Sequence, residues 1–148
     1  NIPQEKEVAL LRRHEMACPS FPHCGRAYAE AERYLPVLMS TLEHNGFAHE
    51  EVIIRLSGCP NGCSRARTAE IGILGRCRST YMLYAGGSPA GYRLNELVHD
   101  NLDEEDLADA VATLLRKWRA TRFSAEERFG DWAVRYGIEN LRAVLHAF

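Results

Sequence analysis

The chain has 148 residues, of which 46% are hydrophobic and 26% charged, and its formal net charge is −2 at pH 7. We expect one folded domain over residues 1–148, because this length and apolar content suit a modest core and exclude intrinsic disorder. The charge gives no case for a nucleic-acid partner, and the lack of any apolar run near ~18 residues argues against a membrane partner.

The beginning of the chain predicts helices. The first residues, NIPQEK, carry no initiator methionine and do not read as a signal peptide, so we expect a cytoplasmic protein that is processed or excised from a longer one. A polar helix is expected over residues 4–15. Residues 26–45 carry apolar side chains at helical spacing, and Pro36 within them predicts a kink or two abutting helices that end at Asn45-Gly46.

The middle of the chain predicts strands. Short runs of β-branched and aromatic residues indicate strands over 52–56, 69–75 and 80–85. The short connection between the last two favours a hairpin. A fourth, short strand is expected near residues 92–94.

The last third of the chain predicts helices again. Asp103 has the character of an N-cap, and the apolar stripe after it indicates a helix to about Arg119. Residues 124–127 (SAEE) fit a capping box that starts a second helix, which Gly137 would end. Residues 138–148 allow one more short helix. Together these elements predict an α+β fold, with a small mixed or antiparallel β-sheet covered by helices.

Five cysteines are the candidate chemical groups, and an odd number argues against a complete disulfide framework. Four of them form two close pairs, with five residues between Cys18 and Cys24 and three between Cys59 and Cys63. This pattern favours a four-thiolate metal site. Spacing leaves open whether the metal is zinc or an iron–sulfur cluster, and redox chemistry or unrelated buried thiols are the other interpretations.

The residues within each pair favour a cluster site. Residues 59–63 (CPNGC) predict a turn that aims both sulfurs to one side and exposes backbone N–H groups. Residues 18–24 (CPSFPHC) contain two prolines and therefore predict a stiff loop that can wrap a bulky group. Phe21 in this loop could exclude water from the group.

These motifs resemble those of the siroheme-dependent sulfite and nitrite reductase family. The stretches that carry the resemblance are MACPSFPHC at 16–24, AEAERYLP at 29–36, SGCPNGCSR at 57–65 and AEIG at 69–72. The resemblance is closest to the C-terminal part of the hemoprotein (β) subunit of assimilatory sulfite reductases. It continues through Gly86-Gly87 and through GDWAVR at 130–135.

The resemblance implies a set of cofactor ligands. Cys18, Cys24, Cys59 and Cys63 would ligate one 4Fe-4S cluster, and Cys63 would also be the axial ligand of the siroheme iron. Asn61 would lie against the macrocycle. Arg65, and with it Arg67, would be candidates for binding siroheme carboxylates.

The family's reaction would be the six-electron reduction of sulfite to sulfide in sulfur assimilation. Electrons would come from an NADPH flavoprotein subunit or from ferredoxin. Two other interpretations stay open: a siroheme nitrite reductase domain, and a non-catalytic metal-binding or electron-transfer module.

The sequence also departs from the family. Members are several times longer, and their basic sulfite-binding residues lie in an upstream part that this chain lacks. We therefore expect no catalytic residue here, an inactive chain when alone, and the upstream part of the same hemoprotein as a partner. Ser88 replaces the usual Asn after the Gly-Gly pair, and Cys77 is not expected to be a ligand.

Overall fold

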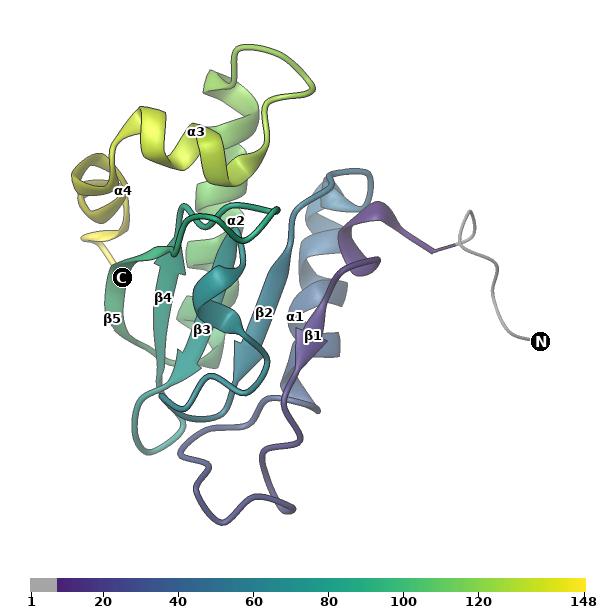
Figure 1. Ribbon diagram of the computed structural model, residues 1–148, viewed down its shortest axis with the longest axis vertical. Helices are drawn as coiled ribbons and strands as arrows, with labels where there is room; N and C mark the ends of the chain where they lie inside the picture. The colour runs from purple at the N-terminus through teal and green to yellow at the C-terminus, as the bar shows by residue number, and fades with distance from the viewer. Residues whose placement is uncertain (1–7) are drawn as a thin grey trace.

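The computed structural model describes residues 8–148, and its centre is a five-stranded mixed sheet in the order β1-β2-β3-β4-β5 (Figure 1). The first three strands run parallel to one another, and the fourth runs antiparallel to both the third and the fifth. The strands are β1 (Met16–Ala17), β2 (Ile54–Ser57), β3 (Ile71–Gly75), β4 (Tyr81–Ala85) and β5 (Glu96–Leu102). The expected α+β class is confirmed, and the sheet is of the mixed kind.

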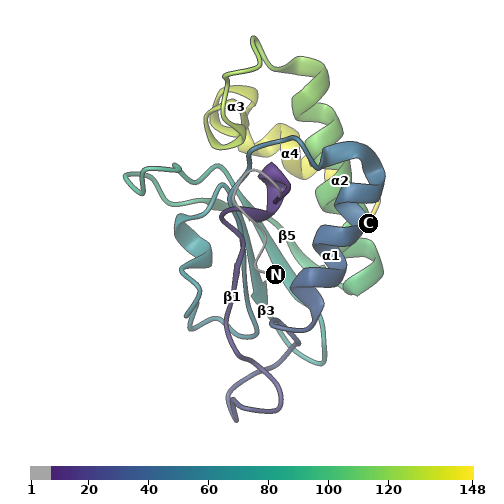
Figure 2. The ribbon, with the colours of Figure 1, turned by 90° about the vertical axis from the view of Figure 1, so that its right-hand side faces the viewer.

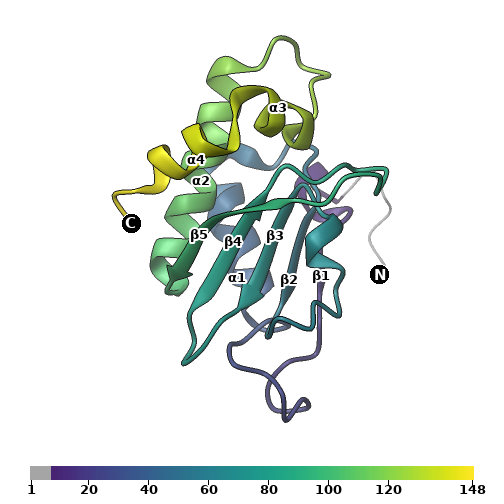
Figure 3. The ribbon, with the colours of Figure 1, turned by 60° about the vertical axis from the view of Figure 1, so that its left-hand side comes forward.

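Helices cover one face of this sheet. Figure 2 shows α1 and α2 side by side on that face, and Figure 3 shows α3 and α4 beyond one end of the strands. The inward side chains of β2 and β3, such as Ile54 and Ile71, are fully buried against them. The helices are α1 (Tyr34–Leu42), α2 (Glu104–Thr121), α3 (Phe129–Tyr136) and α4 (Ile138–Leu145).

The opposite face of the sheet carries a thinner cover. A short 3-10 helix, η4 (Ala66–Thr68), lies against it, and residues 86–95 run beside this helix (Figure 3). The helix sits directly on the sheet backbone, since a Cβ added to Gly72 would lie 2.2 Å from the carbonyl oxygen of Ala66. Asn95 fixes the cover by donating hydrogen bonds to the carbonyls of Ala66 and Ala69.

The helix expected over residues 26–45 is shorter than predicted. It begins at Tyr34, because the backbone before it is held elsewhere: the N–H groups of Tyr28 and Ala29 donate to the carbonyl of Gly58. The kink expected at Pro36 is absent from α1, since this proline occupies the first turn, where its missing N–H needs no partner. A π-helical segment, η3 (Glu43–Phe47), follows with Gly46 at a φ of 84°.

Three other expectations on secondary structure are corrected. No strand forms at residues 92–94. The strand β5 begins at Glu96, directly after Asn95, whose side chain donates a hydrogen bond to the carbonyl of Ala66. Residues 124–127 form a turn rather than a helix start, and α3 begins at Phe129. Of the helix expected over 4–15, residues 4–7 lie outside the described part, and the rest contains only the 3-10 helix η2 (Leu10–Arg12).

The C-terminal predictions are largely confirmed. The carboxylate of Asp103 accepts a hydrogen bond from the N–H of Asp106 and caps α2. Gly137, at a φ of 100°, ends α3, and α4 follows as the expected short helix. Within residues 8–148, none of the helices has the length and apolar character that a membrane crossing requires.

Candidate functional site

The two cysteine pairs lie on loops that leave neighbouring parallel strands. Cys18 directly follows β1, and Cys59 follows the end of β2 by two residues. Because parallel strands end at the same edge of a sheet, both loops emerge together. Cys18 and Cys59 are buried, Cys24 is half-buried and Cys63 is exposed; none of the four is in a disulfide.

Gly58 joins the two loops. Its N–H donates a hydrogen bond of 3.2 Å to the sulfur of Cys18, and its carbonyl accepts from Tyr28 and Ala29 at 2.8 and 3.1 Å. The loops approach so closely here that a Cβ on Gly58 would lie 2.4 Å from Oγ of Ser20. Only glycine fits this position, and the two cysteine loops therefore form one unit.

Ser20 organises the first loop from inside. Its side chain is fully buried, and its Oγ donates a hydrogen bond of 2.5 Å to the carbonyl of Ala29. Its own carbonyl accepts from the N–H of Cys24 at 2.7 Å. Ser20 takes a φ of 51°, a backbone conformation that non-glycine residues rarely adopt. These hydrogen bonds close the loop between Cys18 and Cys24.

The second loop forms the predicted turn. The N–H of Gly62 donates to the carbonyl of Cys59 at 3.3 Å, and Gly62 has the positive φ, 66°, that the turn requires. Ser57 anchors the end of the loop: its Oγ accepts from the N–H of Ser64 and shares a hydrogen bond of 2.7 Å with the Ser64 hydroxyl. Cys63 is thereby held at the surface while Cys59 is buried.

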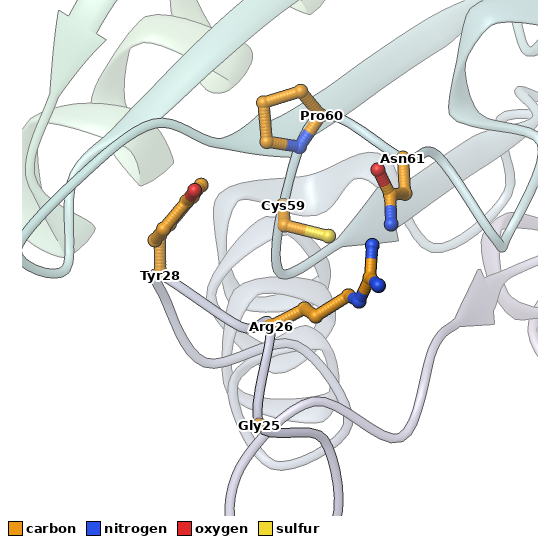
Figure 4. A pocket seen from close by; sticks show the side chains of 6 residues that line it. All are labelled: Gly25, Arg26, Tyr28, Cys59, Pro60 and Asn61. Carbon is orange, nitrogen blue, oxygen red and sulfur yellow. The ribbon is translucent and has the colours of Figure 1, made fainter.

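A cavity of about 330 Å³ opens between the two loops. Figure 4 shows the sulfur of Cys59 pointing into the space between the Arg26 guanidinium and the Asn61 amide. Among residues 8–148, Arg26 has neither an ion-pair nor a hydrogen-bond partner for its side chain. The cavity is lined by Gly25, Arg26, Tyr28, Cys59, Pro60 and Asn61.

The cavity separates the expected cofactor residues. Asn61 lines it, whereas Arg65 lines a different cavity beside Arg55 and Thr68. Arg67 lies over the Tyr84 ring at 4.4 Å and donates to Asn95, so its guanidinium is engaged within the fold.

Sequence reasoning missed Arg26 as a residue of the site. A signal was present, since Arg26 follows Cys24 by two residues just as Arg65 follows Cys63. Cys77 is exposed in the β3–β4 turn, 3.9 Å from Oγ1 of Thr80, and is not among the residues that line this cavity.

The donor set fits an iron–sulfur cluster by its chemistry. Four free thiols lie on two loops that are hydrogen-bonded to each other, and a backbone N–H already points at one sulfur, as is common around clusters. Within the described part of the chain, however, no three Cys, His, Asp or Glu side chains are gathered closely enough to hold a metal ion. The structure thus brings the loops together without bringing the four sulfurs to one point.

Sequence comparison relates most of the chain to known reductases. Residues 11–147 match the family described as the nitrite and sulphite reductase 4Fe-4S domain. The chain is 46% identical over 136 residues to a sulfite reductase (NADPH) hemoprotein beta-component of Chromohalobacter salexigens, covering 89% of this chain and 24% of that protein. The protein of the same name from Oceanobacillus iheyensis is 41% identical over 150 residues, covering 98% and 26%. The chain spans about a quarter of the length of these relatives.

Solved structures share the fold. The NirA protein of Mycobacterium tuberculosis superposes with a TM-score of 0.69 at 23% identity, over 90% of this chain and 27% of that one. Dissimilatory sulfite reductase I superposes with a TM-score of 0.70 at 12% identity, over 90% and 52%. With the family match over residues 11–147, these findings show that the chain belongs to the nitrite and sulphite reductase 4Fe-4S domain family.

Proposed function

We propose that residues 1–148 are the cluster- and siroheme-binding domain of a sulfite reductase, with Cys18, Cys24, Cys59 and Cys63 as the ligands of one 4Fe-4S cluster. The observation that carries this proposal is the junction at Gly58, which ties the two cysteine loops together and places an N–H on the Cys18 sulfur. Family membership supports the cluster type. A cluster held by all four thiols would require the exposed Cys63 and the half-buried Cys24 to lie closer to the buried Cys18 and Cys59.

Cys63 is proposed to be shared between the cluster and the iron of siroheme. Two features of the second loop support this role: Cys63 is the exposed ligand, and the exposed Asn61 lies on the same turn. A group bound outside this loop can therefore reach the Cys63 sulfur without disturbing the buried Cys59. Siroheme, when bound, would supply the metal centre at which substrate is reduced, and Cys63 would be the residue that holds it beside the cluster.

The residues around the loops would bind and orient that group. Asn61 would contact the macrocycle with its amide, and Arg26, from the same cavity, offers a guanidinium without an acidic partner in residues 8–148. Arg65 is proposed to bind a siroheme carboxylate. The forked guanidinium group of arginine suits carboxylates. Among the described residues, the guanidinium of Arg65 has no partner that would compete with a siroheme carboxylate.

The reaction proposed for the whole protein is the six-electron reduction of sulfite to sulfide in sulfur assimilation. The relatives named above are hemoprotein beta-components of NADPH sulfite reductases, which favours sulfite over nitrite and an NADPH flavoprotein over ferredoxin as electron donor. No catalytic residue is assigned to this chain. The groups that bind sulfite and deliver protons would come from the remaining part of the same hemoprotein, which we propose as a partner of this chain.

Spectroscopy of a single variant tests the shared ligand. We expect the anaerobically reconstituted chain to bind added siroheme with an electron paramagnetic resonance signal that reports coupling between haem and cluster. Cys63→Ser should abolish that coupling, while Cys77→Ser, a matched change at an exposed thiol, should preserve it. Unchanged coupling in Cys63→Ser would overturn the assignment of Cys63.

A further inference from the structure

A second cavity lies on the face of the sheet opposite α1 and α2. It has a volume of about 330 Å³, at the small end of the range for ligand pockets. Its walls come from the start of β2, from η4 with the residue before it, and from the loop after β4. The lining residues are Ile53, Arg55, Arg65, Thr68, Pro89, Ala90 and Gly91.

The charge of this cavity is one-sided. Two of its lining residues, Arg55 and Arg65, are cationic, and none is acidic. Within residues 8–148 neither guanidinium forms an ion pair, whereas Arg128 on the same protein is paired with both Glu51 and Glu70. Two guanidiniums beside one small cavity without a carboxylate leave a positive charge that an anion would neutralise.

Arg55 is also short of hydrogen-bond acceptors. Its Nε is buried and has no partner, and its Nη1 reaches only the hydroxyl oxygen of Thr68, at 3.4 Å. A buried N–H without an acceptor is costly, so such groups in folded proteins are usually satisfied by another group. An oxyanion beside Arg55 would supply the acceptors that the protein itself does not.

The walls of the cavity are held in place by backbone contacts. Arg65 sits at a φ of 57°, with its N–H donating to Gly62 and its carbonyl accepting from the hydroxyl of Thr68. The loop on the other side is closed by Ser88, which is fully buried and accepts from the N–H groups of Ala90 and Gly91. The cavity is therefore preformed, which lowers the entropic cost of binding.

We propose that this cavity is an anion site, in which Arg55 and Arg65 together bind one small oxyanion of the carboxylate, sulfate or phosphate class. The site stands on the geometry of β2, η4 and residues 88–91 and does not require the cluster. The oxyanion has two possible sources, a free ion or a carboxylate at the edge of the siroheme proposed above. Both present the same chemistry to the two guanidiniums.

The test is a titration of the 148-residue protein with sulfate, at constant ionic strength kept with chloride. We expect saturable shifts of the Nε–H resonances of Arg55 and Arg65 in nuclear magnetic resonance spectra. Arg55→Gln and Arg65→Gln should each weaken binding about tenfold, as the loss of a charged hydrogen bond implies. Arg116→Gln, which makes the same change on the exposed side of α2, should leave binding unchanged.

The outcomes are distinct. Absence of saturation, or equal weakening in Arg116→Gln, would overturn the site. Arg65 is exposed, so Arg65→Gln decides the matter even if Arg55→Gln fails to fold. If prior loading with siroheme removes the sulfate response, the natural anion is a siroheme carboxylate; if the response persists, it is a free ion. Either result supports the site. Iron content is measured in parallel. A protein that binds iron but not sulfate would overturn the anion site alone, and a protein that binds sulfate but not iron would overturn the cluster proposal alone.

Discussion

The backbone N–H of Gly58 donates a hydrogen bond to the sulfur of Cys18, across a distance of 3.2 Å and a separation of 40 residues in the chain. This contact links the first cysteine loop to the second before any metal is considered. A hydrogen bond donated to a ligand sulfur is also one of the features by which proteins set cluster potentials. The junction therefore serves both the fold and the proposed chemistry.

Replacement of this glycine should damage fold and site together. In Gly58→Ala the new Cβ would lie 2.4 Å from Ser20 Oγ and 2.5 Å from the Ala29 carbonyl oxygen, so the two loops must separate. We expect a loss of about 1–3 kcal/mol in the free energy of unfolding, typical of overpacking, and less iron bound after reconstitution. Urea unfolding and iron analysis would measure both.

The control is the neighbouring loop glycine. Gly25 has no atom within 4 Å of its added Cβ, so Gly25→Ala should have the same free energy of unfolding as the native protein. Equal behaviour of Gly58→Ala and Gly25→Ala would show that the close approach at Gly58 is unimportant.

Glu70 should be the most sensitive charged residue of the fold. It is fully buried, pairs with Arg128 at 2.7 Å and accepts from the N–H groups of Ile53 and Gly130 at 3.0 Å. In Glu70→Gln the new amide nitrogen would face an N–H group that now donates to the carboxylate, and Arg128 would lose its buried charged partner. We therefore expect the free energy of unfolding to fall by about 3–5 kcal/mol. Glu51→Gln removes the exposed partner of the same arginine and should cost no more than about 1 kcal/mol. Similar losses of unfolding free energy in Glu70→Gln and Glu51→Gln would contradict the prediction that the buried partner matters more than the exposed one.

The ion pair between Arg12 and Glu43 should give stability that depends on pH. Hydrogen bonding to Arg12 holds the pKa of Glu43 below its usual 4.5. Because the pKa of Glu43 is lower in the folded than in the unfolded protein, the pair stabilises the fold fully at a pH above the unfolded-state pKa. This stabilisation is lost as the pH falls through the folded-state pKa. Unfolding midpoints from about pH 6 to about pH 3 should therefore converge for native protein and Glu43→Gln at the acid end.

A matched exposed pair controls this experiment. Glu139→Gln, which breaks an exposed pair with Arg142, should follow the native curve throughout. Burial raises the pKa of Glu15, which acts in the opposite direction, and the nearby Glu43 adds to that rise, so Glu43→Gln removes a part of it. A constant gap between native protein and Glu43→Gln at all pH values would contradict the prediction.

Local sequence signals identified most of the elements. Asp103 and the stripe after it marked α2, because capping and helical periodicity are properties of adjacent residues. The two-residue strand β1 and the late start of α1 were not predictable in this way. Both depend on contacts with the segment around Gly58, far along the chain, which no local pattern encodes.

The candidate site shows the same division. The cysteine spacing and the turn at residues 59–63 marked the loops, and the structure places these loops together. The roles of Gly58 and Arg26 were missed, since an interior glycine and an exposed arginine have many ordinary explanations in a sequence. The place of Arg65, which lines a cavity with Arg55 and not with Asn61, emerges only in three dimensions.

Iron and acid-labile sulfide, measured on the anaerobically reconstituted protein and on two cysteine variants, test the central claim most directly. We predict about four irons and about four sulfides per chain in the native protein and in Cys77→Ser, and a loss of both in Cys59→Ser. Stoichiometric zinc without sulfide, or a full cluster in Cys59→Ser, would contradict the assignment of the four paired cysteines as the ligands of a 4Fe-4S cluster.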